Sequence, residues 1–135
     1  MVALFLYSQW GGPIEFVLPA GFHGPIWVVE DPNVDTTLDS TYSTLEGYSI
    51  RVPENGVLRF SSVRPFKKWH SITARFEDGT DLYDGDAGYY LRDGTTAFRR
   101  GGSAVTKDGL FTVYYHVGPR GEAAKFFSEK PLPNK

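Results

Sequence analysis

Residues 48–60 read Tyr48-Ser49-Ile50-Arg51-Val52-Pro53-Glu54-Asn55-Gly56-Val57-Leu58-Arg59-Phe60, and this stretch carries the pattern that decides the fold. Apolar residues alternate with polar ones from Tyr48 to Val52 and again from Leu58 to Phe60. Successive side chains of a β-strand point to opposite faces, so a period of two predicts strands with one apolar face. The Asn-Gly pair between them tolerates the positive φ of tight turns and predicts a hairpin.

The same pattern recurs along the chain. Residues 72–76 alternate in the same way, and further turn sequences separate the strands: Trp10-Gly11-Gly12-Pro13, Glu77-Asp78-Gly79-Thr80, Arg92-Asp93-Gly94-Thr95, Lys107-Asp108-Gly109 and Gly118-Pro119-Arg120-Gly121. Residues 26–29 and 111–117 are apolar or aromatic at almost every position, which is typical of central strands that are covered on both faces. The sequence therefore predicts many strands joined by tight turns.

Helical patterns are weak. No window of a dozen residues carries a helical apolar stripe, so we expect at most one short helical turn, within residues 34–45 or near Ala123. Residues 31–47 are rich in Asp, Ser and Thr and predict a long crossing loop or a poorly ordered arm. We expect an all-β fold, an antiparallel β-sandwich with little or no helix, as one domain over residues 1–130 with a frayed tail at 131–135.

Composition limits the function classes. The 135 residues are 41% hydrophobic and 22% charged, which is typical of a single globular domain. A formal net charge of −2 disfavours nucleic-acid binding, which depends on phosphate contacts by basic residues. The absence of cysteine excludes thiol chemistry and Cys-ligated zinc. The apolar run at residues 2–7 is too short for a transmembrane helix and predicts a strand. As given, the chain predicts a cytoplasmic protein, or an envelope or secreted one if a leader is removed.

One acidic cluster offers candidate metal ligands. Asp81, Asp84 and Asp86 follow Glu77 and Asp78, and carboxylates that converge from one loop can bind calcium. The spacing does not match an EF-hand loop. Because hairpin turns also select Asp and Gly, the alternative is a pair of solvated turns.

Three histidines, His23, His70 and His116, are candidate catalytic residues. They are far apart in sequence and form no HxH or HExxH motif, and no GxSxG motif is present. A hydrolase or isomerase that uses His70 or His116 would need an acidic partner brought close by the fold. The alternative is that these histidines are structural or exposed.

The segment Arg99-Arg100-Gly101-Gly102-Ser103 is a candidate anion site. Guanidinium groups and backbone N–H groups exposed at glycines both bind anions. Arg64, Lys67 and Lys68 would extend a basic patch if the fold brought them near. The alternative is a solvent-exposed basic loop.

Aromatic residues make up 16% of the chain and offer a second kind of binding surface. Trp10, Trp69 and the pair Tyr89-Tyr90 could present flat rings that stack on sugars or anchor a protein partner. Neighbouring residues on a strand point to opposite faces, so one member of a pair can leave the core. The alternative is that these rings fill the core.

The stretch Phe16-Val17-Leu18-Pro19-Ala20-Gly21-Phe22-His23-Gly24-Pro25-Ile26-Trp27-Val28-Val29 resembles the opening of a bacterial family of small β-domain proteins of unknown function. Residues 48–58 are similar to the second element of that family, and residues 115–118 are similar to its last core strand. The resemblance implies a transthyretin-like or carboxypeptidase-regulatory-like β-sandwich, a type often carried by envelope or lipid-anchored proteins. It implies no catalytic residues, and the sequence lacks the lipobox cysteine of that pattern.

These observations predict a non-enzymatic binding or protein-interaction domain that needs no cofactor. The partner would be another protein or a second copy of the chain, paired through an edge strand. One alternative is a carbohydrate-binding module that uses exposed aromatic residues. The other is a small hydrolase or isomerase that uses His70 or His116.

Overall fold

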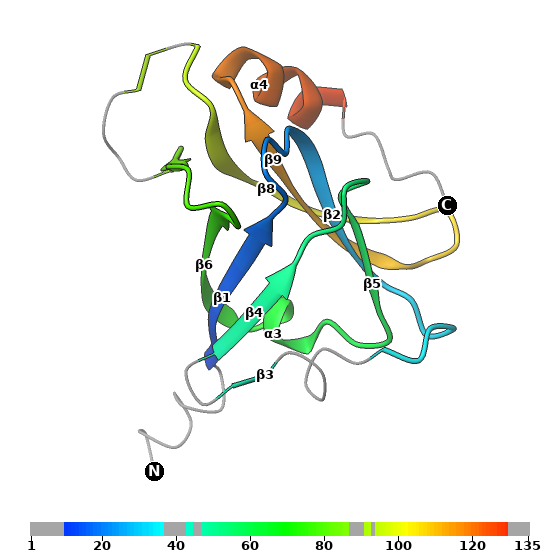
Figure 1. Ribbon diagram of the computed structural model, residues 1–135. Coiled ribbons are helices and arrows are strands. Elements are labelled where there is room, and N and C mark those ends of the chain that lie inside the picture. Colours follow the sequence, from blue (N-terminus) through cyan, green and yellow to red (C-terminus); the bar gives the residue numbers. More distant parts are fainter. Residues whose placement is uncertain (1–9, 37–42, 45–46, 87–90, 93, 130–135) are drawn as a thin grey trace.

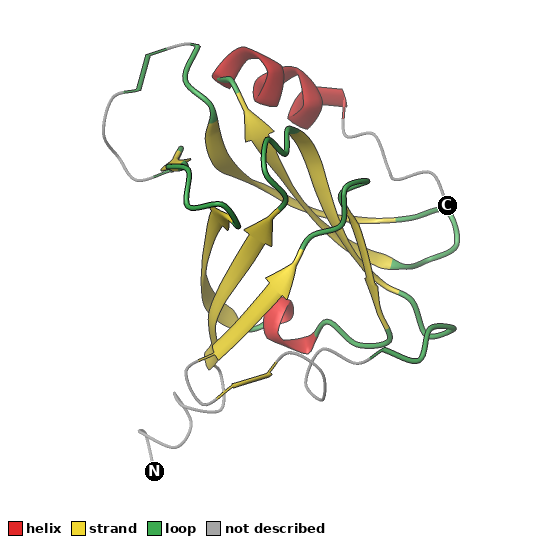
Figure 2. Ribbon diagram, in the orientation of Figure 1, coloured by secondary structure: helices red, strands yellow, loops and turns green. Residues whose placement is uncertain are grey.

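Two β-sheets and two helices make up the computed structural model, which describes residues 10–36, 43–44, 47–86, 91–92 and 94–129 (Figures 1 and 2). The strands are β1 (Trp10–Leu18), β2 (Gly24–Glu30), β3 (Ser43–Thr44), β4 (Gly47–Arg51), β5 (Val57–Phe60), β6 (Trp69–Phe76), β7 (Tyr83–Asp84), β8 (Ala97–Val105) and β9 (Phe111–Gly118). The helices are α3 (Arg64–Lys67) and α4 (Arg120–Glu129). The prediction of a strand-rich fold is confirmed.

The two sheets are mixed. The first has the order β3-β4-β1-β6, and β1 is parallel to both β4 and β6. The second has the order β5-β2-β9-β8-β7, in which β2 is parallel to β5 and β7 to β8, while β9 is antiparallel to β2 and β8. The predicted central strands, β2 and β9, do lie inside the second sheet. The prediction of a wholly antiparallel arrangement is wrong.

Crossings between the sheets explain the parallel pairs β1–β4, β1–β6 and β2–β5. Apart from the short strand β3, which pairs antiparallel with β4 of the same sheet, the chain from β1 to β6 alternates between the two sheets. Each second crossing returns it to a sheet in its original direction. The turn at Pro53–Gly56 links β4 of the first sheet to β5 of the second, so it does not form the predicted hairpin. The turn at Lys107–Gly109, in contrast, joins the neighbouring antiparallel strands β8 and β9. Gly11-Gly12-Pro13 lies within β1 beside a register shift and is not a turn.

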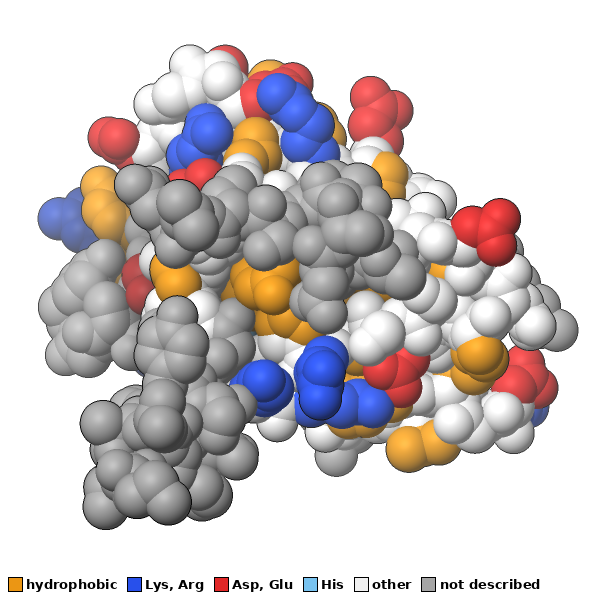
Figure 3. All heavy atoms as spheres, turned by 90° about the horizontal axis from the view of Figure 1, so that it is seen from below, with side chains coloured by type: hydrophobic (Ala, Val, Ile, Leu, Met, Phe, Trp, Pro, Cys, Tyr) orange, Lys and Arg blue, Asp and Glu red, His pale blue; other side chains and the backbone are white. Residues whose placement is uncertain are grey.

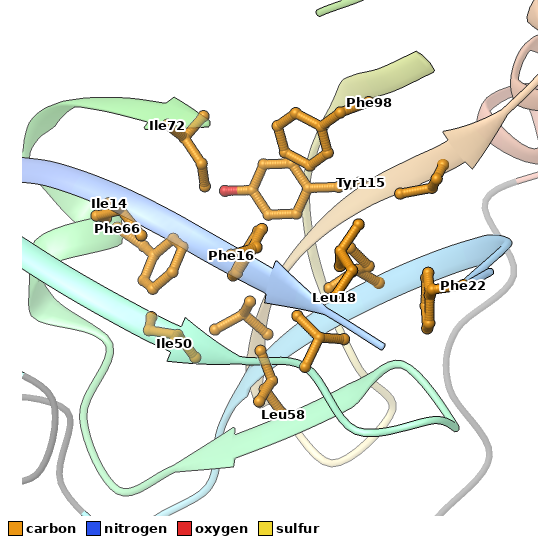
Figure 4. Packing of buried hydrophobic residues seen from close by; sticks show 14 of the residues in the cluster. Ile14, Phe16, Leu18, Phe22, Ile50, Leu58, Phe66, Ile72, Phe98 and Tyr115 are labelled. Atoms are coloured by element: carbon orange, nitrogen blue, oxygen red, sulfur yellow. The ribbon is translucent and has the colours of Figure 1, made fainter. Parts of the chain in front are cut away.

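Side chains from both sheets meet in one core (Figure 4). Phe16 of β1 is fully buried and contacts the rings of Phe66, Phe98 and Tyr115. The alternating positions of residues 50–60 and 72–76 supply buried core residues as predicted: Ile50, Val52, Leu58, Phe60, Ile72 and Phe76.

The described residues contain more helix than the single short turn predicted from the sequence. α4 forms near Ala123, one of the two places considered, but it is ten residues long. Its apolar residues Ala123, Phe126 and Phe127 have helical spacing and face β9 and β2, where Phe126 contacts Trp27, Tyr114 and His116. α3 is a single turn that begins beside Pro65 and was not predicted.

Some predicted features lie outside the described residues. These are the strand at 2–7, residues 37–42 and 45–46 of the loop predicted over 31–47, and the tail at 131–135. No helix among the described residues is long and apolar enough to cross a membrane.

Candidate ligand-binding cleft

A cleft of about 540 Å³ opens between the two sheets, where α3 and the start of β6 face β8 and β9. Its lining is largely aromatic and aliphatic and includes three basic side chains, those of Lys67, His70 and Arg100. The full set of lining residues is Phe66, Lys67, His70, Ile72, Arg100, Gly101, Gly102, Ser103, Phe111, Val113, Tyr114 and Tyr115. α3 lies at the lower end of the molecule in Figure 1, and on the face seen from below, Lys and Arg side chains gather beside hydrophobic ones (Figure 3). The fold therefore brings residues 66–72 to residues 100–115.

Tyr115 forms the wall that continues into the core. Its ring is stacked on Phe98 with centroids 5.5 Å apart and meets Phe16 edge to face. Its hydroxyl end is directed towards Ile72 (Figure 4). Burial raises the pKa of Tyr115, and the nearby Arg100 guanidinium partly offsets that rise. Tyr115 therefore stays neutral and serves the cleft as an aromatic surface with a polar tip.

A β-bulge shapes the adjoining part of the same wall. Arg100 pairs with Tyr115 and Ser103 with Val113, so β8 has one residue more than β9 in this interval. The extra length falls on Gly101 and Gly102. A Cβ at Gly101 would lie 2.3 Å from Cδ2 of Tyr114, and one at Gly102 would lie 3.3 Å from the Tyr114 hydroxyl. The two glycines therefore let β8 pass directly over the Tyr114 ring.

Lys67 is held by a carboxylate and a ring. Its Nζ lies 2.8 Å from Oε1 of Glu30 and 4.9 Å from the centroid of Phe111. Burial raises the pKa of Glu30, but hydrogen bonds from Lys67 and from the Val63 N–H outweigh it, so the net pKa lies below the usual range. The charge of Lys67 is therefore largely compensated by Glu30.

Arg100 bridges the two sheets at the cleft. Its Nη2 donates a hydrogen bond of 3.1 Å to the carbonyl oxygen of Ile72 on β6. Its backbone N–H donates to Oδ2 of Asp86 at 2.9 Å. These two bonds hold the residue from both ends and keep the guanidinium at the cleft wall.

His70 is the third basic residue of the cleft. Its Nδ1 lies 2.6 Å from the carbonyl oxygen of Lys68, and because a carbonyl only accepts, Nδ1 carries the hydrogen. This leaves Nε2 as the remaining polar atom of the ring. Phe66 packs edge to face against the imidazole, with centroids 5.7 Å apart.

The structure brings together only part of the predicted basic patch. Arg100, Gly101, Gly102 and Ser103 line the cleft with Lys67, whereas Arg64 and Lys68 do not. Arg99 points elsewhere: its Nε lies 3.5 Å from the Gly118 carbonyl oxygen, and its side chain packs against Gly85. Sequence reasoning missed Ile72, Phe66 and Phe111 as cleft residues because their patterns indicated only strand and core.

Carboxylates of the acidic cluster accept backbone hydrogen bonds, and that of Asp86 accepts the one from Arg100. Oδ1 of Asp84 accepts the backbone N–H of Asp86, Oδ1 of Asp78 accepts that of Thr80, and Asp81 is exposed. Within the described ranges, no group of three or more His, Cys, Asp or Glu side chains is placed to hold a metal ion. The structure thus does not bring Asp81, Asp84 and Asp86 together as a calcium site.

Of the residues predicted to form an aromatic surface, the structure gives the backbone positions of Trp10 and Trp69. Trp10 and Trp69 are register partners at one end of the β1–β6 pair. Tyr89 and Tyr90 lie outside the described residues.

The other two histidines meet a carboxylate that the sequence did not indicate. Oε1 of Glu122 on α4 lies 2.9 Å from Nε2 of His23 and 3.3 Å from Nε2 of His116. His116 is 2% exposed, and its Nδ1 has no hydrogen-bond partner in the described part of the chain. Phe126 and Phe127 pack against its ring. His116 thus has an acidic partner but is closed off from solvent, and His70, which is in the cleft, is bonded to a carbonyl instead.

Comparison with known proteins adds little to this description. No family model matches the chain, and no curated protein matches it by sequence. Among solved structures, the chain is similar to one described as "Putative Lipoprotein from Bacillus anthracis", with 13% sequence identity and a TM-score of 0.45. The match covers 93% of this chain and 82% of that one. The transthyretin-like or carboxypeptidase-regulatory-like resemblance stays a prediction.

Proposed function

We propose that the protein is a non-enzymatic binding domain, built as a β-sandwich, whose cleft between the two sheets takes a small organic ligand. The observation that carries the proposal is the cleft itself. Its volume of about 540 Å³ lies within the roughly 300–1,000 Å³ typical of ligand pockets. Aromatic walls with a few polar groups are also the usual composition of such pockets.

The placement of the histidines favours binding over catalysis. A hydrolase or isomerase needs an acid or base within reach of its substrate. His116 has a carboxylate partner but is buried beneath α4, and His70 has access to the cleft but is bonded to the Lys68 carbonyl oxygen. The carbohydrate-binding alternative depends on Trp10, Trp69, Tyr89 and Tyr90 and remains a prediction.

Fluorescent probes test the proposal. We expect 1-anilinonaphthalene-8-sulfonate, which is anionic, or N-phenyl-1-naphthylamine, which is neutral, to bind saturably at one site per chain. Ser103→Trp places a large ring in the cleft and should abolish this binding. Val105→Trp is the matched control, because Val105 is exposed on the same strand but does not line the cleft. Absence of saturable binding of both probes, or equal loss in the two variants, would overturn the proposal.

A further inference from the structure

The lining of the cleft is unbalanced in charge. Lys67, His70 and Arg100 line it, and no Asp or Glu is among its described lining residues. The chain as a whole carries a formal net charge of −2, so this positive site does not follow from the average composition. A cleft with basic groups and without acidic ones favours a negatively charged ligand.

Arg100 is the basic residue whose charge remains available. Lys67 is paired with Glu30, whereas no carboxylate in the described part of the chain forms an ion pair with the Arg100 guanidinium. The hydrogen bond to Ile72 uses one of the five N–H groups of the guanidinium. It also orients the guanidinium, which lowers the entropy lost when a ligand binds.

Neutral donors surround the same position. The bulge gives the Arg100–Ser103 segment one residue more than the facing segment of β9, and the added length is glycine, whose backbone no side chain shields. The Ser103 hydroxyl lies on the cleft wall beside it. Backbone N–H groups, a hydroxyl and a guanidinium together are suited to bind the oxygens of a carboxylate, sulfonate or phosphate.

The rest of the cleft is suited to an apolar body. Phe66, Phe111 and Tyr115 supply flat rings, and Ile72 and Val113 supply aliphatic surface. Such walls bury the carbon skeleton of a ligand while its charged end contacts the bulge.

We propose, building on the binding function above, that the ligand is a small organic anion with an aromatic or aliphatic body, and that Arg100 is the residue that selects for its negative charge. The class includes aromatic carboxylates and sulfonates. Arg100 binds the anionic group, and the aromatic walls bind the body.

Substitution of Arg100 tests the selection. Loss of a charge-assisted hydrogen bond is worth about 1.5–3 kcal/mol, which corresponds to roughly 10- to 150-fold in affinity. Arg100→Gln should therefore weaken 1-anilinonaphthalene-8-sulfonate at least about 10-fold and leave N-phenyl-1-naphthylamine within about 2-fold. Arg99→Gln is the matched control, since Arg99 is the adjacent residue and does not line the cleft; it should leave both probes unchanged.

A second measurement uses the unmodified protein and does not depend on the stability of a variant. Benzoate should displace the bound anionic probe, while benzyl alcohol at the same concentration should not, and added salt should weaken the anionic probe more than the neutral one. If both probes bind the cleft but Arg100→Gln weakens them equally, or if benzyl alcohol competes as well as benzoate, the ligand is not selected by charge and this inference fails while the binding function stands. If neither probe binds, the binding function itself fails.

Discussion

The rings of Phe16 on β1 and Tyr115 on β9 meet edge to face with centroids 5.2 Å apart, and this contact joins the first sheet to the second. Phe16 has no exposed surface, and it also contacts Phe66 and Phe98. The inner wall of the cleft is thus continuous with the centre of the core. The stability of the fold and the shape of the site depend on the same residues.

Phe16→Ala should lower the free energy of unfolding by about 3–5 kcal/mol, because it removes the ring and leaves a cavity between the sheets. Urea denaturation at neutral pH measures the loss. Val105→Ala is the control: Val105 is 64% exposed, so its truncation should change stability by no more than about 0.5 kcal/mol. A loss below about 1 kcal/mol for Phe16→Ala would contradict the packing described here.

Gly101→Ala should destabilise the fold by about 1–3 kcal/mol, because the new methyl group would overlap the Tyr114 ring and its backbone. The same change should alter the cleft wall and reduce probe binding. Gly94→Ala offers a comparison at a glycine with open space around it, and we expect it to be close to neutral. Equal stability of the two variants would show that β8 does not pass over Tyr114 as described.

The turn at Gly56 allows a comparison of strain with crowding. Gly56 and Gly79 both have positive φ, at 74° and 83°. A Cβ at Gly56 would lie 2.3 Å from the Pro25 carbonyl oxygen, whereas one at Gly79 would meet nothing within 4 Å. Gly79→Ala should therefore cost only the left-handed backbone strain, about 1–2 kcal/mol, and Gly56→Ala should cost about 1–3 kcal/mol more. Thermal unfolding of the two variants measures the difference in stability. A smaller loss of stability for Gly56→Ala than for Gly79→Ala would contradict the close contact between Gly56 and Pro25.

Stability should fall as the pH drops below the ordinary histidine range. Burial lowers the pKa of His116; Glu122 opposes the shift, and His23 and Arg99 favour it. Because the folded pKa lies below the unfolded value of about 6.5, the unfolded chain binds more protons in this window. The stabilisation by neutral His116 is therefore complete above about pH 6.5 and is lost as the pH falls through the folded pKa.

His116→Phe removes this titration and keeps a ring against Phe126 and Phe127. The melting temperature of the unmodified protein should fall between pH 8 and pH 5 by more than that of the variant. Parallel curves for the two proteins would show that His116 does not titrate with folding.

Local patterns were sufficient to predict which residues enter the core. Ile50, Val52, Leu58 and Phe60 alternate with polar residues and are buried, because the period of two is a property of each strand on its own. The Asn-Gly pair at residues 55–56 likewise predicted a reversal of the chain. It did not predict that the reversal leads to the other sheet, since a turn sequence specifies backbone angles and not the strand that will become a neighbour.

The site shows the same division between sequence and structure. The Arg99–Ser103 motif indicated an anion site, and its chemistry was visible from residue types alone. Only the tertiary structure decided that Arg100, and not Arg99, reaches the cleft, because neighbouring side chains on a strand leave on opposite faces and β6 of the other sheet supplies the Ile72 carbonyl. Likewise, His23 and Glu122 are 99 positions apart and meet at 2.9 Å only because β2 and α4 both lie against β9, a relationship of packing that no local pattern encodes.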